Sequence, residues 1–293
     1  IAINEFGKES VAYSDVCFNH GRILYLTNNK ALFTDALRWF MDAMNVIEKL
    51  LGKENSKYAL CLSNIGKLKS KFGETKEAET LYLSALEIWR SATFFDSIEY
   101  AKCAGNLAII FVEKQEFESA EALMVEVKNI FLKLVGENNA LYGNAVFSLG
   151  NLYFVRSDYL DAEAQYLKVA DIWEKALGKN HENYSAIIIQ LGNLYQELGR
   201  YEVSLKYLIL ADSLLAMNGV ENPYYVFNKM NQSVIYLTLG QYQKAEKLSL
   251  ESCNLFKNAF GVSNVNYLGS LINLGNFYHC IGDIERGRKQ FVE

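Results

Sequence analysis

The chain has 293 residues, of which 51% are hydrophobic and 13% aromatic, and its formal net charge is −5. This composition supplies ample apolar side chains for a buried core. Because the charges are interspersed and the balance is acidic, the sequence offers no basic field for nucleic acid or an anionic membrane surface. Its apolar runs are short and interrupted, which excludes a membrane-spanning helix. Neither nucleic acid nor a membrane is expected as a partner.

The dominant feature of the sequence is a repeat of about 42 residues. A small residue recurs at successive intervals of 42, 42, 42, 42, 41 and 42, at Ala36, Ala78, Ala120, Ala162, Ser204, Ala245 and Gly287. A glycine-type position precedes it, at Gly21, Gly66, Ala108, Gly150, Gly192, Ser233 and Gly275. Eight residues before that stands a tyrosine, at Tyr13, Tyr58, Tyr100, Tyr142, Tyr184, Tyr225 and Tyr267. Such a period predicts one array of repeats rather than two globular domains.

The repeats follow one another without a linker. Their expected ranges are 11–52, 56–94, 97–136, 140–178, 182–219, 223–261 and 265–293. In the fourth, residues 142–155 place apolar side chains at spacings of three and four, which predicts an amphipathic helix. Residues 157–159 are expected to break it, and residues 161–176 to form a second helix. Each repeat is therefore predicted to be an antiparallel helix pair that buries its apolar stripe by stacking on its neighbours.

A glycine closes most repeats and fits the left-handed residue that ends a helix. These glycines are Gly7, Gly52, Gly136, Gly178 and Gly261. Residues 1–6 are then expected to be the tail of a helix whose repeat lies upstream. The sequence also stops at Glu293, inside the last repeat. We therefore expect a fragment of a longer protein, truncated within repeats at both ends.

The repeat resembles the tetratricopeptide repeat (TPR) over residues 7–293. The residues that carry the resemblance are Leu149, Gly150, Tyr153, Tyr159, Ala162 and Tyr166. With A-E-x-x-Y-L-x-A-L-E-I at residues 78–88, it looks like the 42-residue kinesin-light-chain subtype, which also occurs in bacterial TPR proteins with a CHAT peptidase domain. The resemblance implies an all-α fold, a right-handed α-solenoid of about seven TPR helix pairs in a single superhelical domain.

One face of each first helix is the candidate binding surface. Residues three before, one after and four after the glycine-type position share that face, and the resemblance implies that it lines a concave groove. The early repeats make this face polar and basic, and the later ones make it apolar with asparagines at intervals. The candidate groove residues are Arg22, Lys67, Phe147, Asn151, Phe154, Ile189, Asn193, Gln196, Met230, Leu237 and Asn276.

The chemistry of this face suits an extended peptide. A carboxamide both donates and accepts, so Asn151 and Asn193 are expected to pair with the N–H and C=O groups of a peptide backbone. The apolar residues would accept its side chains. Arg22 and Lys67 are expected either to attract an acidic segment or simply to be solvated. The alternative for the whole face is structural packing, or cover by another domain of the same longer chain.

Catalytic patterns are weak. His181 and Glu182 begin like a zinc-protease helix, but Ser185 stands where the second histidine is needed. His279 and Cys280 are neighbours on a predicted helix and point roughly 100° apart, which does not make a nucleophile–base pair. We therefore expect no catalytic residue, no metal and no cofactor.

The five cysteines are an odd number, which argues against a disulfide framework. Cys61 and Cys103 occupy the same repeat position and are expected to be small buried apolar residues. Free thiols and an acidic charge fit a reducing compartment, so we expect the cytoplasm.

These observations favour a non-catalytic scaffold that binds a peptide or protein partner in the groove. Two alternatives rest on the resemblance alone. The first is a regulatory or sensor region of a larger enzyme, such as a caspase-like CHAT peptidase. The second is an adaptor like kinesin light chain.

Overall fold

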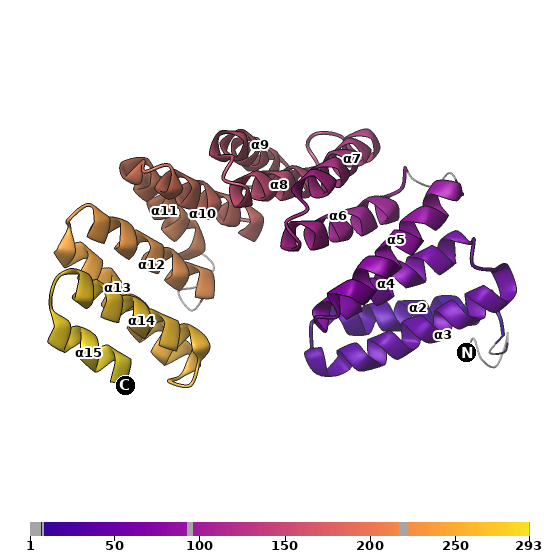
Figure 1. Ribbon diagram of the computed structural model, residues 1–293, viewed down its shortest axis with the longest axis horizontal. Coiled ribbons are helices and arrows are strands. Elements are labelled where there is room, and N and C mark those ends of the chain that lie inside the picture. The colour runs from indigo at the N-terminus through magenta and orange to yellow at the C-terminus, as the bar shows by residue number, and fades with distance from the viewer. Residues whose placement is uncertain (1–6, 8, 93–95, 217–221, 293) are drawn as a thin grey trace. The chain divides into compact units, whose positions relative to one another are not determined.

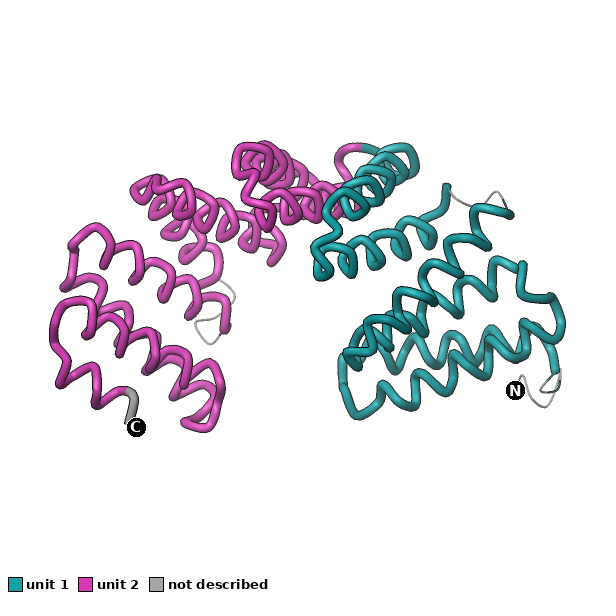
Figure 2. Tube along the Cα trace, in the orientation of Figure 1, with its two compact units in different colours: residues 1–136 teal, residues 137–293 magenta. Residues whose placement is uncertain are grey.

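A computed structural model describes residues 7, 9–92, 96–216 and 222–292 of the chain. Within these ranges the fold is all-α, with fourteen α-helices, α2 to α15, and one short 3-10 helix (Figure 1). The chain divides into two compact units, residues 1–136 and 137–293 (Figure 2), and each is described by itself. The helix tail expected at residues 1–6 lies outside the described residues.

Unit 1 contains three helix pairs. They are α2 (Val11–Leu26) with α3 (Phe33–Leu51), α4 (Ser56–Lys71) with α5 (Thr75–Ser91), and α6 (Ile98–Glu113) with α7 (Phe117–Val135), and η1 (Lys30–Leu32) precedes α3. Each pair packs on the next through α3 with α4 and α5 with α6.

Unit 2 contains four helix pairs. They are α8 (Ala140–Val155) with α9 (Tyr159–Leu177), α10 (Glu182–Glu197) with α11 (Tyr201–Ala216), α12 (Pro223–Thr238) with α13 (Tyr242–Phe260), and α14 (Val265–Cys280) with α15 (Ile284–Val292). Successive pairs pack through α9 with α10, α11 with α12 and α13 with α14. The prediction of an all-α fold built from about seven sequential helix pairs is confirmed, and each predicted repeat range contains one pair.

A three-residue turn joins the two helices of each regular pair. In the fourth pair Ser157 adopts φ 67°, the amide of Asp158 donates to the carbonyl of Tyr153 at 2.8 Å, and that of Ser157 donates to Phe154 at 3.0 Å. These two bonds form a Schellman motif, which satisfies the last carbonyls of α8. Because the turn closes so tightly, α9 begins at Tyr159. The predicted start at residue 161 was two residues late.

A second kind of link joins one pair to the next. Gly52, Gly136, Gly178 and Gly261 have φ between 79° and 84°, so the positive φ predicted for the end of the helix is confirmed. Their ψ values of 160° to 174° are extended and lie outside the left-handed helical region that was expected. The following first helix begins with a side-chain cap, such as Asn139, whose Oδ1 accepts from the amide of Leu141 at 2.9 Å. Capping bonds of this kind are worth about 1 kcal/mol each. The links therefore set where each first helix starts.

The small residues lie where the two helices of a pair cross. A Cβ atom added to Gly150 would stand 2.8 Å from the ring of Tyr166, and one added to Gly66 would stand 2.8 Å from the ring of Tyr82. Both rings are buried. The sequence-based prediction of close helix approach at these positions is confirmed.

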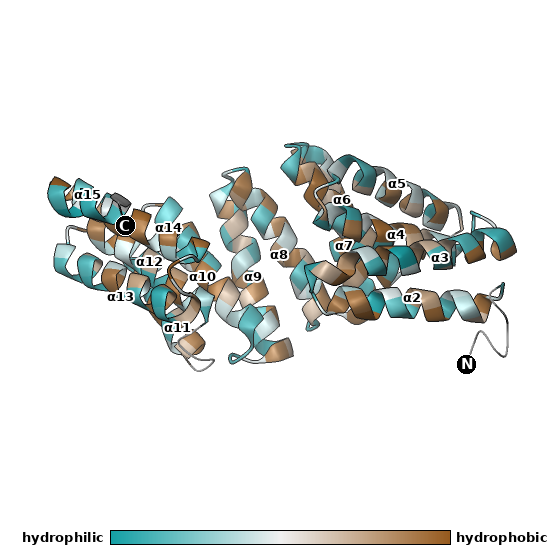
Figure 3. Cartoon of the chain, turned by 90° about the horizontal axis from the view of Figure 1, so that it is seen from below, coloured by the Kyte–Doolittle hydropathy of each residue, from teal (hydrophilic) through white to brown (hydrophobic). Residues whose placement is uncertain are grey.

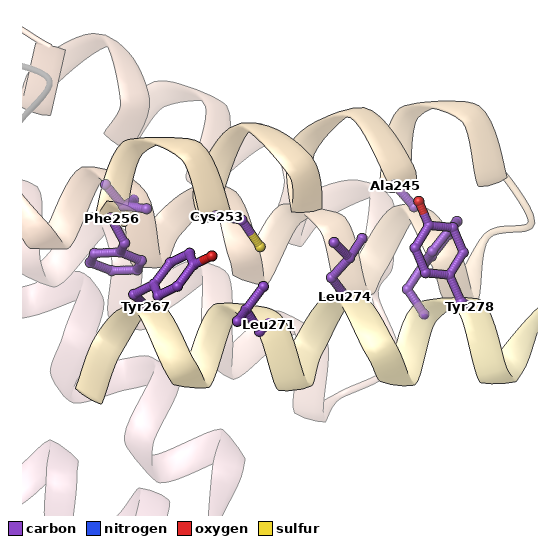
Figure 4. Close-up of a cluster of buried hydrophobic side chains, with 9 residues drawn as sticks. Ala245, Cys253, Phe256, Tyr267, Leu271, Leu274 and Tyr278 are labelled. Atoms are coloured by element: carbon purple, nitrogen blue, oxygen red, sulfur yellow. The ribbon is translucent and has the colours of Figure 1, made fainter. Parts of the chain in front are cut away.

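The core runs between the helices within each unit. Figure 3 shows that hydrophobic and hydrophilic residues alternate along the helices, as expected of helices with one buried face. In Figure 4, Tyr267, Leu271 and Leu274 of α14 point toward α13, where they meet Cys253 and Phe256. The apolar stripe of one pair is therefore buried by the next.

Cys61 and Cys103 are buried apolar residues, as predicted. Burial raises the pKa of both thiols to about 12. Within the described ranges, none of the helices combines the length and apolarity that crossing a membrane requires.

Candidate functional site

The first helices of neighbouring pairs lie side by side. Within unit 1, α4 contacts α6, and within unit 2, α10 contacts α12 and α12 contacts α14. Of the predicted groove residues, Arg22 and Asn276 are exposed, and the others are half-buried. Half-burial means that one side of each side chain packs on its own unit.

Asn151 is tied to its own helix pair. Its Oδ1 accepts a hydrogen bond from the hydroxyl of Tyr166 at 2.7 Å. Tyr166 is buried, and desolvation raises the pKa of its hydroxyl, so this group stays a neutral donor. One lone pair of the Asn151 oxygen is therefore engaged, while its NH2 group and the second lone pair are not used by this bond. The two-sided backbone pairing predicted for this residue stays a prediction.

Asn193 makes a bond that the repeat pattern did not predict. Its Oδ1 accepts from Nδ2 of Asn231 at 3.0 Å, which links α10 to α12. Asn231 lies 38 residues after Asn193, whereas the equivalent position of the next repeat lies 41 residues after it. Aligning equivalent positions of the repeats therefore does not bring these two residues together. Among the described residues, Nδ2 of Asn193 and Oδ1 of Asn231 have no further hydrogen bond. The pair thus presents one donor and one acceptor side by side.

The aromatic residues of the predicted face belong partly to the core. The ring centroid of Phe147 lies 5.2 Å from that of Trp173 and 6.0 Å from that of Tyr166. Phe154 lies 5.7 Å from Tyr159 in the same measure. These rings hold α8 against α9 and expose only part of their surface.

The aliphatic residues behave in the same way. Ile189 packs against the buried cluster of Leu205, Leu208 and Ile235. Met230 and Leu237 pack on the cluster between α12, α13 and α14. Gln196 is half-buried on α10. The apolar candidates therefore form the outer edge of the core of unit 2.

Unit 1 carries two pockets on the corresponding face, each of about 340 Å³. Both are lined by Tyr25 and Lys67, and one of them also contains Arg22 and Lys102. Lys67 is half-buried, its Nζ lies 3.4 Å from Oδ1 of Asn64, and burial lowers the pKa of its ammonium group. Of the two expectations for Lys67, an acidic partner or full solvation, the partial shielding by the pocket walls is the observation that bears on both. Arg22 is exposed at the rim.

The histidines singled out by the sequence take other places. His181 caps α10, and its Nδ1 accepts from the amide of Asn183 at 3.1 Å. His279 and Cys280 are both exposed at the end of α14. In the described part of the chain, no group of three or more His, Cys, Asp or Glu residues is arranged to hold a metal ion.

Stacked antiparallel helix pairs, with small residues at the crossings and a recurring pair of turns, define an α-helical repeat protein. A family model described as tetratricopeptide repeat matches residues 28–91 and 142–211. Over these residues the chain carries tetratricopeptide repeats. A search of curated proteins found no match.

Solved structures with the same fold include repeat proteins of several kinds. The apo form of the quorum sensor NprR from B. thuringiensis has a TM-score of 0.70 and 14% identity, over 97% of this chain and 76% of that chain. A Rap protein complexed with Competence and Sporulation Factor has a TM-score of 0.61 and 14% identity, over 95% and 77%. The TPR-like repeats of a putative kinesin light chain from Podosopora anserina have a TM-score of 0.58 and 18% identity, over 65% and 91%. At these identities the likeness establishes the fold.

Proposed function

We propose that the chain binds an extended peptide segment of a protein partner along the first-helix faces of its repeats. The observation that carries the proposal is the Asn193–Asn231 pair, which leaves one amide donor and one amide acceptor unused between α10 and α12. A peptide group has one C=O and one N–H, so a segment lying across the pair would satisfy both. The proposed role is that of a binding scaffold.

The surroundings of the pair suit a peptide. Ile189 and Met230 lie on the same face, and each is half-buried, so an apolar side chain of the ligand would complete their cover. Met230 adds a flexible wall that adapts to different side chains. Asn151 adds a further donor on α8. A ligand would thus meet backbone-directed amides interleaved with apolar surface, which is the pattern that extended peptides need.

A protein with the same fold supports the proposal. The Rap protein structure is a complex with Competence and Sporulation Factor, so this kind of helix-pair array accommodates a bound factor. The support concerns the architecture alone, and the amide pair described above is what extends it to this chain.

The test is to select peptides from a random dodecapeptide display library on the purified chain and to measure their affinities by fluorescence anisotropy. Replacing both Asn193 and Asn231 with alanine removes two ligand bonds of about 0.5–1.5 kcal/mol each, so we expect an affinity loss of about tenfold. The matched control is Asn254→Ala, an exposed asparagine on the second helix α13. Equal losses in the two variants, or a selection that enriches no peptide, would contradict the proposal.

A further inference from the structure

We infer that the pocket between α2, α4 and α6 of unit 1 receives an acidic side chain of the bound peptide, with Lys67 as its main partner. The inference rests on the proposed function, because it adds the chemistry of one ligand residue to the peptide-binding face. It concerns a different unit from the Asn193–Asn231 pair, so the two are tested separately.

The pocket has an excess of positive charge. Arg22, Lys67 and Lys102 line it together with a single carboxylate, that of Glu99. Glu99 is already engaged, since Nζ of Lys102 lies 3.3 Å from its Oε1. This pairing leaves Arg22 and Lys67 as the cations without a counter-ion in the pocket. The remaining walls are Phe18, Tyr25, Leu26, Leu60 and Asn64.

Lys67 holds its charge in an unfavourable place. No carboxylate oxygen of the described residues lies within 4.0 Å of its Nζ, whose hydrogen bond is to the amide oxygen of Asn64. Burial is the largest cause of its lowered pKa, the cation of Lys102 adds to the effect, and the carboxylate of Glu99 opposes it. The other titratable groups that line the two pockets are Arg22, Tyr25, Lys71, Tyr82 and Glu113. A shielded ammonium without a counter-ion is a strong attractor for an anion.

Lys229 in unit 2 is a second shielded lysine, but here the fold supplies carboxylate counter-ions. The side chain of this lysine is also shielded from solvent, but its Nζ lies 3.2 Å from Glu251 and 3.5 Å from Asp212. The ring centroid of Tyr225 is 4.6 Å away. The pKa of Lys229 is raised although burial alone would lower it, because these partners outweigh desolvation. The contrast identifies a carboxylate as the group that is missing beside Lys67.

The shape of the pocket favours a glutamate or aspartate side chain as the source of that carboxylate. Its volume of about 340 Å³ exceeds that of one side chain, so it can admit an acidic residue with part of its neighbours, and Phe18, Leu26 and Leu60 offer apolar contact to methylene groups. Arg22 stands exposed at the rim, where its planar guanidinium can bind the second carboxylate oxygen. A peptide with an acidic residue between apolar neighbours is therefore the ligand that fits.

The experiment measures how fast Lys67 is acetylated by an N-hydroxysuccinimide ester, using mass spectrometry on the full chain. The probes are the capped peptides acetyl-Gly-Leu-Glu-Leu-Gly-amide and its glutamine counterpart, at millimolar concentration. The free amine is the reactive form, so a bound carboxylate protects Lys67 both by contact and by raising its pKa. We expect the glutamate peptide to slow the reaction at least threefold and the glutamine peptide to leave it unchanged. The exposed Lys247 is the internal reference.

Two outcomes would overturn the inference. If both peptides protect Lys67 equally, the face binds peptides without reading an acidic residue, and the proposed function stands. If neither peptide protects it, the pocket is not an acidic-residue site, and the library selection on the amide pair decides the proposed function by itself. Arg22→Gln provides a second check, since it should weaken the protection by the glutamate peptide about threefold or more without altering the acetylation rate of Lys67 in the free protein.

Discussion

A lysine ammonium that the fold shields without neutralising has a cost that depends on pH. The pKa of Lys67 is lower in the folded chain than in the unfolded chain, where it is about 10.4. Between these two values the unfolded state binds more protons, so the contribution of Lys67 to stability rises with pH. Below the folded pKa the penalty is present in full.

Lys67→Met should therefore unfold at higher urea concentration than the wild type at pH 8, with a gap that narrows as the pH approaches 10. The buried tyrosines, such as Tyr82 and Tyr166, have raised pKa values, so both proteins lose stability above about pH 10. For that reason the informative quantity is the difference between the two proteins, measured by circular dichroism. Lys247→Met on the surface is the control. A gap that stays constant with pH would contradict this account of Lys67.

The thiols offer a second test at the scale of single residues. Cys280 is exposed, and the other four are buried. Burial raises the pKa of each buried thiol, which keeps the reactive thiolate scarce. We expect one thiol per native chain to react promptly with Ellman's reagent and the remaining four to react only as the chain unfolds. Cys280→Ser should remove the prompt reaction, and a second fast thiol in that variant would show that one of the buried sites opens.

At the scale of the element, the turns inside the pairs share one backbone requirement. Each has a residue at positive φ, and four of them supply glycine, at Gly73, Gly199, Gly240 and Gly282. Asn28, Gln115 and Ser157 take the same place with a side chain. A left-handed conformation costs a residue with a Cβ roughly 1–2 kcal/mol, so these three turns hold strain that the others avoid.

Gln115→Gly should therefore stabilise the chain. Glycine relieves the strain but has more freedom to lose on folding, and the net gain expected in the free energy of unfolding is about 0.5–1 kcal/mol. Gln115 is exposed, so no packing is lost. Gln115→Ala keeps the Cβ and should bring no gain. Urea unfolding measures both variants, and equal stabilities would show that the turn is not strained.

The elements of this fold could be predicted well because the repeat shows them seven times. Period, pairing, link glycines and close crossings all follow from positions that recur. The start of α9 was missed because Tyr159, as an aromatic in a loop, gives no sign that a Schellman motif has already ended the turn. The cap by His181 was missed for a similar reason, since a histidine takes the place that asparagine or serine holds in the other repeats.

The candidate site was less predictable, because its chemistry lies between repeats. The Asn193–Asn231 hydrogen bond joins positions of two neighbouring repeats that are not equivalent to each other. The shielding of Lys67 depends on side chains from three helices. The repeat pattern aligned these residues with the equivalent residues of other repeats. It did not predict which side chains of the neighbouring helices they contact. Ligand binding by the predicted groove residues, and the single superhelical domain, remain predictions.

At the scale of the molecule, stability should be a sum over pairs and the contacts between neighbours. Gly150→Ala places a methyl group 2.8 Å from the ring of Tyr166, an overpacking cost of about 1–3 kcal/mol, from which the better helix propensity of alanine subtracts about 1 kcal/mol. A Cβ on Gly105 meets nothing within 4 Å, so Gly105→Ala should stabilise by about 1 kcal/mol.

The location of the effect is the stronger test. Gly150→Ala should speed amide hydrogen exchange in α8 and α9 more than in α14 and α15, which lie in the same unit but are separated from them by two pairs. Uniformly faster exchange across unit 2 would mean that its four pairs unfold as one block.

Seven similar helix pairs suggest that one pair could be deleted or exchanged for another. The ion pairs of Lys229 indicate that this does not hold for every pair. Its counter-ions come from α11 on one side and α13 on the other. Deleting the α12–α13 pair would leave Asp212 without its cation, and transplanting the pair would leave Lys229 with Glu251 as its only counter-ion of the two. A shortened array should therefore keep α11 next to α12, because the ion pair between Asp212 and Lys229 joins these two helices.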